Sequence, residues 1–156
     1  MLVGNRELRL VEPADAGELL TLQRACWVQE QQANPGVAID ALTETLDDVR
    51  AWITEGTVFV LRSRGRLVGA VRARLHGDET WDIGRLMVAP DLQGEGIGRL
   101  LLEAAEAAAP AGATSYQLFT GAGSLRNQRM YKRAGYRLRG DRAPGVVQLT
   151  KPRPPR

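Results

Sequence analysis

Residues 93–98, with the sequence QGEGIG, form the segment whose composition and spacing point most directly to chemistry. Its glycines alternate at Gly94, Gly96 and Gly98, and an apolar run follows at once. A glycine loop at the start of a helix presents several backbone N–H groups at the positive end of the helix dipole. Glycine also lacks the Cβ atom that would keep an anion away from these donors. The segment therefore predicts a binding site for a phosphate or pyrophosphate group.

Two common phosphate-binding motifs do not fit this segment. The dinucleotide fingerprint G-x-G-x-x-G requires a third glycine where this chain has Arg99. A P-loop requires a lysine, and the segment contains none. Gly98 falls inside the expected helix, where glycine costs about 1 kcal/mol relative to alanine, so we expect some group to approach the backbone there. A flexible turn at the helix entry is the structural alternative.

The composition excludes several other kinds of site. Cys26 is the only cysteine and His76 the only histidine, which argues against an intramolecular disulfide, a metal centre and a Ser-His-Asp triad. We therefore expect no metal. No apolar run reaches the roughly 18 residues that span a membrane, and the N-terminal residues lack the pattern of a secretory signal. A soluble, cytoplasmic protein without a membrane partner is the expectation.

A basic cluster lies within residues 126–142. Its cations are Arg126, Arg129, Lys132, Arg133, Arg137, Arg139 and Arg142. A nucleic-acid surface is one interpretation of such a cluster, but the formal charge of the chain is only +3, which is weak for duplex binding. We favour a solvated helix face and a basic rim for a small phosphate ligand, and expect no nucleic-acid partner.

The elements that position these residues follow from the spacing of apolar side chains. Strands are expected over residues 7–13, 57–63, 66–76, 79–89, 113–121, 136–140 and 145–150, and helices over residues 15–32, 42–56, 98–109 and 124–135. Asp15, Thr43 and Ser124 are the candidate N-caps of three of these helices, and Gly56 and Gly135 are candidate stops.

The order of these elements predicts the fold class. Tight turns make neighbouring strands antiparallel, whereas a helical crossover after residue 96 requires a parallel pair. We expect one α/β domain over residues 1–151, with a mixed, mostly antiparallel sheet of about six or seven strands flanked by four helices. Residues 152–156 are expected to form a flexible tail. A cleft should open at the ends of the parallel strands.

Residues 81–136 resemble the core of the GNAT-type N-acetyltransferase superfamily. The family's pyrophosphate motif, Q/R-x-x-G-x-G/A, matches residues 93–98, and LMVAPDLQGEGIGRLLL matches its preceding strand and following helix. The segment MYKRAGY, residues 130–136, matches the family's later lYeklGF segment. The order of elements fits the fold over nearly the whole chain, whereas residues 1–55 match in element type alone.

The resemblance implies acetyl-CoA, or a close acyl-CoA, as cosubstrate. The pyrophosphate would bind loop N–H groups, and the two amides of pantetheine would pair with the backbone of the preceding strand. The family's commoner pattern has an asparagine where this chain has Ser124, so Ser124 and Asn127 are both candidates for a pantetheine contact. The residues assigned to the cosubstrate are Leu86, Met87, Val88, Gln93, Gly94, Glu95, Gly96, Ile97, Gly98, Arg99, Ser124 and Asn127.

Acetyl transfer to an amine needs a neutral amine, a polarised thioester carbonyl and a proton for the leaving thiolate. Tyr131 matches the family's tyrosine that protonates the sulfur of CoA, so it is the expected general acid. Asp82 stands six residues before Val88, where some family members carry a general base. Because side chains alternate along a strand, Asp82, Gly84, Leu86 and Val88 are expected on one face.

Several alternatives to Asp82 exist for the base. His76 has the more suitable unperturbed pKa, and Glu30 and Glu79 are weaker candidates. A reaction without a dedicated base is a further alternative, because positioning supplies much of the rate.

The sequence thus predicts an acetyl-CoA-dependent N-acetyltransferase acting on a primary amine of a small molecule or peptide. The alternative is a non-catalytic module of the same fold that senses acyl-CoA or binds a partner. Trp27 is a candidate wall of the acceptor pocket. Acidic residues that suggest a cationic acceptor are Glu30, Asp40, Glu44, Asp47 and Asp48. A homodimer is compatible with the sequence.

Overall fold

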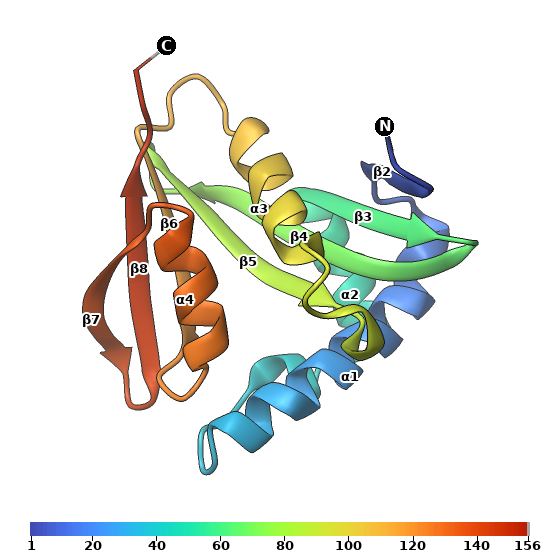
Figure 1. Ribbon diagram of the computed structural model, residues 1–156, viewed down its shortest axis with the longest axis horizontal. Coiled ribbons are helices and arrows are strands. Elements are labelled where there is room, and N and C mark those ends of the chain that lie inside the picture. Colours follow the sequence, from blue (N-terminus) through green and yellow to red (C-terminus); the bar gives the residue numbers. More distant parts are fainter. Residues whose placement is uncertain (156) are drawn as a thin grey trace.

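The structure, a computed structural model, describes residues 1–155 (Figure 1). Its strands are β1 (Leu2–Val3), β2 (Arg6–Leu10), β3 (Thr57–Ser63), β4 (Arg66–His76), β5 (Thr80–Val88), β6 (Ser115–Gly121), β7 (Arg137–Ala143) and β8 (Val146–Pro152). Its α-helices are α1 (Ala16–Ala33), α2 (Leu46–Glu55), α3 (Ile97–Ala107) and α4 (Leu125–Arg133). Within residues 1–155, no helix is both long and apolar enough to cross a membrane.

All strands belong to one sheet, in the order β1-β2-β3-β4-β5-β6-β8-β7. Every neighbouring pair is antiparallel except β5 and β6, which are joined through α3. The expected α/β fold with a mostly antiparallel sheet and four helices is confirmed. The sheet has eight strands instead of six or seven, because Leu2 and Val3 add a short pairing with β2.

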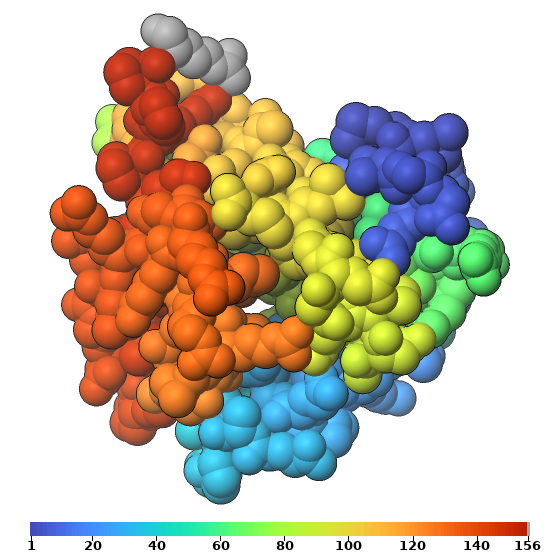
Figure 2. All heavy atoms as spheres, viewed as in Figure 1, coloured from blue at the N-terminus to red at the C-terminus, as the bar shows by residue number. Residues whose placement is uncertain are grey.

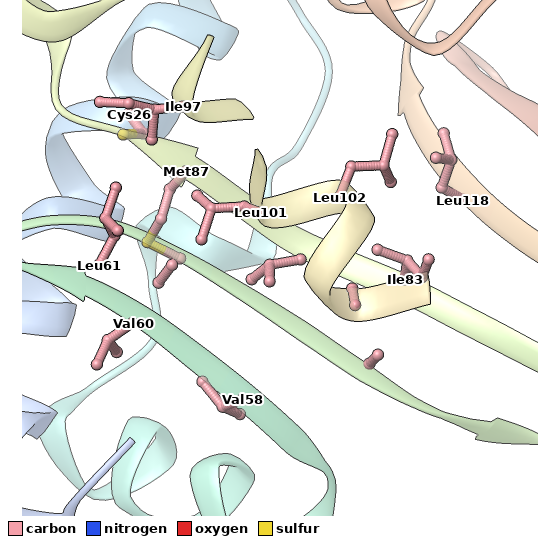
Figure 3. Close-up of a cluster of buried hydrophobic side chains, with 14 of the residues drawn as sticks. Cys26, Val58, Val60, Leu61, Ile83, Met87, Ile97, Leu101, Leu102 and Leu118 are labelled. Carbon is pink, nitrogen blue, oxygen red and sulfur yellow. The ribbon is translucent and has the colours of Figure 1, made fainter. Parts of the chain in front are cut away.

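The core lies between the sheet and the helices that cover it. On one face, α3 packs over β3, β4 and β5 and buries Leu101 and Leu102 completely. Figure 3 shows Leu102 directed toward Leu118 of β6, beside Ile83 of β5. The opposite face carries α1 and α2, where Trp52 of α2 is buried. The packing of α3 on β3, β4 and β5 fixes the position of its N-terminus.

A bulge in β5 changes the face that its side chains occupy. Ala70 of β4 pairs with Met87 and Arg72 pairs with Gly84, so β5 has one residue more than β4 in this interval. Arg85 takes up the difference in a left-handed conformation, with φ of 49°. A bulge of this kind shifts the alternation of side chains by one residue.

The expectation that Asp82, Gly84, Leu86 and Val88 share a face is therefore wrong. Gly84 pairs with Arg72, whose guanidinium lies 5.1 Å from the ring centroid of Trp52, on the α2 side. Val88 pairs with Gly69, where a Cβ atom would lie 2.9 Å from Leu101 of α3. Asp82 thus shares the α2 side with Gly84, whereas Leu86 and Val88 face α3.

One of the expected helix starts differs. The helix α2 begins after Thr45, whose hydroxyl accepts a hydrogen bond from the Asp48 amide at 3.2 Å, so the cap is Thr45 and not Thr43. Asp15 and Ser124 occupy the N-cap positions of α1 and α4 as expected, but neither side chain makes a capping hydrogen bond. Gly56 follows α2 and Gly135, with φ of 97°, follows α4, so both stop signals are confirmed.

The C-terminal boundary lies later than residue 151. Pro152 belongs to β8 and pairs with Ser115. The Arg153 amide donates to the Thr114 carbonyl at 2.8 Å, and its guanidinium donates to the Ala113 carbonyl at 3.0 Å. Residues 152 and 153 are thus part of the domain and not of a flexible tail, and residue 156 lies outside the described residues.

A buried carboxylate joins β2, β3 and the start of α1. Asp15 is 2% exposed and accepts hydrogen bonds from Arg9 Nη1 at 2.8 Å, Arg62 Nη2 at 2.7 Å and the Glu12 amide at 2.7 Å. The bonds from Arg9, followed by those from Arg62 and Glu12, outweigh burial and lower the pKa of Asp15 well below its usual value. Its charge is therefore an integral part of the folded state.

We expect Asp15→Asn to lower the free energy of unfolding at pH 7 by about 3 kcal/mol, because two partly buried arginines lose their counterion. Since the folded pKa lies below the ordinary value of 3.8, the difference from wild type is complete above that pH. It shrinks as the pH falls toward the lowered pKa. Urea unfolding at several pH values measures it.

The matched control is Asp47→Asn, since the Asp47 side chain is 89% exposed in its pair with Arg50. The control should leave stability unchanged. Equal stability of the Asp15→Asn variant and wild type at pH 7 would contradict this interpretation.

Candidate functional site

A large cavity opens where β5 and β6 separate. The two strands pair only over Thr80–Asp82 of β5 and Ser115–Gln117 of β6. Beyond that point a cavity of about 1210 Å³ extends between α1, the loop before α3, and α4. In Figure 2 the surface is hollowed where the orange atoms of α4, the yellow-green loop and the blue atoms of α1 meet.

The glycine loop gives this cavity a row of backbone donors. Gly94 and Gly96 have φ of 84° and 81°, in the left-handed region that favours glycine. The first amide of α3 with a backbone acceptor is that of Leu100, which donates to the Gly96 carbonyl at 3.1 Å. Within the described chain, the amides of residues 93–99 have no backbone acceptor. They form a concave set of donors suited to an anion.

Gly98 has a packing role as well. A Cβ atom at this position would lie 3.0 Å from the sulfur of Met130 in α4 and 3.9 Å from Leu86. The close approach expected from the sequence is therefore made at least by Met130. Glycine at residue 98 lets α3 and α4 come together beside the cavity.

Side chains of the loop are bound to the surrounding elements. Gln93 donates to Gln29 of α1 at 2.9 Å and accepts from Arg126 of α4 at 3.2 Å. Glu95 forms an ion pair with Arg6 of β2 at 2.6 Å and does not line the cavity. The loop is thus fixed from three sides, and Glu95 has only its backbone to offer a ligand.

Part of the basic cluster borders the cavity. The arginines of the cluster that line it are Arg126, Arg129 and Arg133, and Arg99 of α3 lines it beside them. Lys132, Arg137, Arg139 and Arg142 do not line it. The three arginines of α4 occupy one face of the helix, at a spacing of three and four residues. This arrangement supports the interpretation as a rim for a phosphate ligand.

The edge of β5 that faces the cavity has no partner strand after Asp82. Leu86, Met87 and Val88 line the cavity there, although the Met87 side chain is only 2% exposed and belongs to the core. The Val88 carbonyl accepts from the Cys26 thiol at 3.2 Å. Burial raises the pKa of Cys26 to about 11, so the thiol keeps its proton and remains a donor.

Ser124 and Asn127 connect α4 to α1 by hydrogen bonds to Glu30. Asn127 Nδ2 donates to Glu30 Oε1 at 2.9 Å, and the Ser124 hydroxyl donates to Glu30 Oε2. Asn34, which is buried, donates to Ser124 Oγ at 3.0 Å and accepts from the Gly123 amide at 2.8 Å. Both predicted cosubstrate residues of α4 therefore already have protein partners.

Two glycines make this junction possible. A Cβ atom at Gly121 would overlap the Asn34 side chain, and one at Gly123 would overlap the Ala33 carbonyl. Sequence reasoning missed Asn34 altogether. The closely spaced pair Gly121 and Gly123 between a strand and a helix was the available signal for a close contact.

Tyr131 lies in the wall of the same cavity. Its side chain is 6% exposed and packs edge-on against Tyr136, with ring centroids 6.1 Å apart. Within residues 1–155 its hydroxyl has no hydrogen-bond partner in the protein. Burial, followed by the negative charge of Glu30, raises the pKa of Tyr131. The phenol therefore keeps its proton at neutral pH and has it available for a ligand.

Asp82 does not reach this cavity. It accepts a hydrogen bond from Gln117 at 3.2 Å and lies 3.8 Å from Arg74, and it is not among the lining residues. His76 and Glu79 are exposed at the far turn between β4 and β5 and do not line the cavity either. Glu30 is the alternative base that does line it, beside Tyr131.

The remaining wall of the cavity contains Trp27, as expected, and Arg85, which sequence reasoning missed. Arg85 forms an ion pair with Glu44 at 2.5 Å. Asp40 lines the same cavity, whereas Asp47 and Asp48 do not. Among the described residues, no group of His, Cys, Asp or Glu side chains is arranged to hold a metal ion.

Several solved structures with a similar fold carry the name of an acetyltransferase. The chain matches the PaiA N-acetyltransferase of Thermoplasma acidophilum, solved with coenzyme A, with a TM-score of 0.81 and 15% identity, covering 96% of this chain and 100% of that one. It matches an acetyltransferase of Thermus thermophilus with a TM-score of 0.75 and 23% identity, over 98% and 100% of the two chains.

A third match is the putative acetyltransferase yncA of Salmonella typhimurium, solved with its cofactor acetyl-CoA. The TM-score is 0.75 at 18% identity, over 96% of this chain and 94% of that one. No curated protein sequence matches the chain. The sequence model of the acetyltransferase (GNAT) family matches residues 18–136, which include the glycine loop, the unpaired edge of β5 and Tyr131. The chain therefore belongs to the acetyltransferase (GNAT) family.

Proposed function

We propose that this protein is an acetyl-CoA-dependent N-acetyltransferase that transfers an acetyl group to a primary amine of a small molecule or peptide by direct attack. The observation that carries the proposal is that one cavity brings together the glycine loop with its unbonded amides, the unpaired edge of β5 and the hydroxyl of Tyr131. The relatives solved with coenzyme A and acetyl-CoA support this cosubstrate.

The cavity has the donors and the room that acetyl-CoA needs. The phosphates of acetyl-CoA suit the loop amides and the arginines at the rim of the cavity. The amides of pantetheine suit the backbone of residues 86–88, which has no strand beside it. The volume of about 1210 Å³ exceeds the roughly 300–1,000 Å³ of typical small-molecule sites. An acceptor therefore has space beside the thioester.

Tyr131 is the proposed general acid. As the bond between carbon and sulfur breaks, negative charge develops on the sulfur, and a buried phenol donates to it more strongly than water does. The raised pKa of Tyr131 keeps the proton on the phenol until that charge appears.

The proton that leaves the amine needs an acceptor in the cavity. Asp82 was the sequence-based candidate, but its oxygens already face Arg74 and Gln117 outside the cavity. Glu30 lines the cavity and its charge acts on Tyr131. We therefore propose Glu30 as the acceptor of the amine proton, with its bonds to Ser124 and Asn127 fixing its orientation.

Coenzyme A should raise the melting temperature of the protein, because it binds the folded state alone.

Arg129→Ala should raise the Kd for CoA roughly three- to tenfold, since an arginine that lines the cavity is lost. Arg137→Ala is the matched control, because Arg137 is an exposed arginine of β7 outside the cavity. Isothermal titration with CoA measures both. Equal effects of the two substitutions would contradict the rim assignment.

Tyr131→Phe should lower kcat by about 10²–10⁴-fold, the contribution of a positioned general acid, without changing the Kd for acetyl-CoA. Release of the CoA thiol from acetyl-CoA in the presence of an accepted amine gives kcat. Full turnover by Tyr131→Phe would remove Tyr131 from the mechanism.

Glu30→Gln should lower kcat/KM by about 10²-fold, because the amine loses its proton acceptor. A glutamine can still accept a bond from Ser124 or Asn127, so binding of acetyl-CoA should persist and distinguishes chemistry from folding. Asp82→Asn is the matched control and should keep the kcat/KM of the wild type. The opposite pattern, with kcat/KM lowered only in Asp82→Asn, would assign the amine proton to Asp82.

A further inference from the structure

Arg85 has a costly and specific position that binding of CoA does not explain. It occupies the bulge of β5 with φ of 49°, a conformation that costs a residue with a Cβ atom of order 1 kcal/mol. It lines the large cavity and also a second cavity of about 440 Å³ beneath α2. The bulge therefore directs an arginine to the boundary between the two cavities.

The guanidinium of Arg85 is held in place but only partly satisfied. Nη2 donates to Glu44 at 2.5 Å, and Glu44 is itself fixed by Gln23 at 3.3 Å. The guanidinium carbon lies 5.6 Å from the ring centroid of Trp27. Nε is buried without a partner, and no hydrogen bond from Nη1 to a described residue exists. A partly buried arginine with a buried, unpartnered Nε calls for an acceptor.

A second arginine lies close to Arg85. Arg72 stacks on Trp52 and forms no ion pair with any described residue, and Trp52 Nε1 is buried without a partner. Burial, followed by the charges of Arg85 and Arg74, lowers the pKa of Arg72 to about 10. Two arginines and an indole thus supply donors on this side of the acceptor region. An anion bound to Arg85 would relieve the repulsion between the guanidinium groups.

The nearby acids do not turn this region into a cation site. Glu44 is committed to Arg85 and Gln23, and Asp48 to the cap of α2 at Thr45. The other two acids that line the second cavity, Asp40 and Glu55, are exposed to solvent, which screens their charges. Glu30 is different, because it lines the large cavity next to Tyr131. The acceptor region therefore has a negative group near the reacting centre and positive groups at Arg85 and Arg72.

Resting on the proposed function, we infer that the acceptor is an amino acid whose carboxylate binds Arg85 while its amine faces Glu30 and Tyr131. A guanidinium already oriented by Glu44 and Trp27 matches the planar geometry of a carboxylate. The amine nitrogen forms a bond to the acetyl carbon as the bond from carbon to sulfur breaks. One proton leaves the amine for Glu30 and one passes from Tyr131 to the sulfur, giving an N-acetylamino acid and the CoA thiol.

The first test compares acceptors that differ only in the carboxylate. Each of a set of α-, β- and γ-amino acids is assayed with acetyl-CoA against its carboxamide and its decarboxylated amine, with thiol release as readout. At least one amino acid should exceed both counterparts by about tenfold or more in kcat/KM, as expected for a charge-assisted hydrogen bond. Decarboxylated amines or carboxamides that react as well as every amino acid would overturn the inference while leaving the proposed function intact.

The second test removes the anion partner. Arg85→Gln should abolish the preference for the amino acid over its decarboxylated amine, and Arg85→Lys should retain part of the preference. Arg50→Gln, an exposed arginine of α2 paired with Asp47, is the matched control. Binding of CoA reports whether each variant is folded. If Arg85→Gln does not fold, the preference of Arg85→Lys for the amino acid decides the test. A preference that persists in the folded Arg85 variants would overturn the inference.

Binding measured without turnover separates the two proposals. With CoA present, the preferred amino acid should raise the melting temperature of the wild type more than its carboxamide does, and this difference should vanish in the Arg85 variant. If the amino acid stabilises the wild type through Arg85 but no amine is acetylated, the proposed function is rejected, whereas the inference that the site binds an amino acid is kept. Absence of both binding and turnover would reject the inference.

Discussion

After Asp82 the edge of β5 toward β6 pairs with no strand, and the site depends on this separation. Buried backbone groups need partners, so an unpaired strand edge is stable only beside water or a ligand. The separation produces the cavity and exposes the backbone of residues 86–88 to it. It persists because α3 anchors β5 on one side, while β8 pairs with β6 along its whole length on the other. The edge of β5 is therefore left unpaired because its neighbour β6 is held away from it by other contacts of the sheet.

The bulge at Arg85 divides β5 into two functional halves. Before it, Asp82 and Gly84 face α2, and after it Leu86 and Val88 face α3 and the glycine loop. One extra residue thus lets a single strand contribute its C-terminal half to the proposed cosubstrate side of the cavity and Arg85 to the proposed acceptor side. The same residue keeps Asp82 out of the cavity, since the regular alternation that would have aligned it with Val88 is broken. Glu30 of α1 occupies the position that Asp82 does not reach.

The sequence was sufficient for the features that depend on local chemistry. Alternation and periodicity predicted the strands and helices, and the glycine spacing with the segment at Tyr131 selected residues that line one cavity in the structure. Three features were not predictable because they depend on the register or docking of distant segments. The bulge conformation falls on Arg85 and not on the neighbouring Gly84, the Glu30 bonds to Ser124 and Asn127 join residues more than 90 positions apart, and Arg153 reaches back to Ala113. Thr45 was missed as a cap because Thr43 offered the same chemistry two residues earlier.

Glycine has two distinct functions around this cavity, and the sequence motif combines them. Gly94 and Gly96 adopt left-handed conformations with an open side toward the ligand region, where a side chain would lie in the path of an anion. Gly98, Gly121 and Gly123 instead permit contacts of α4 and its preceding loop with α3 and α1. Close packing of α4 is what brings Tyr131, Arg126 and Asn127 to the cavity wall. Because one helix carries the proposed acid, part of the phosphate rim and the bonds to Glu30, a substitution at these packing glycines would disturb cosubstrate binding and chemistry together.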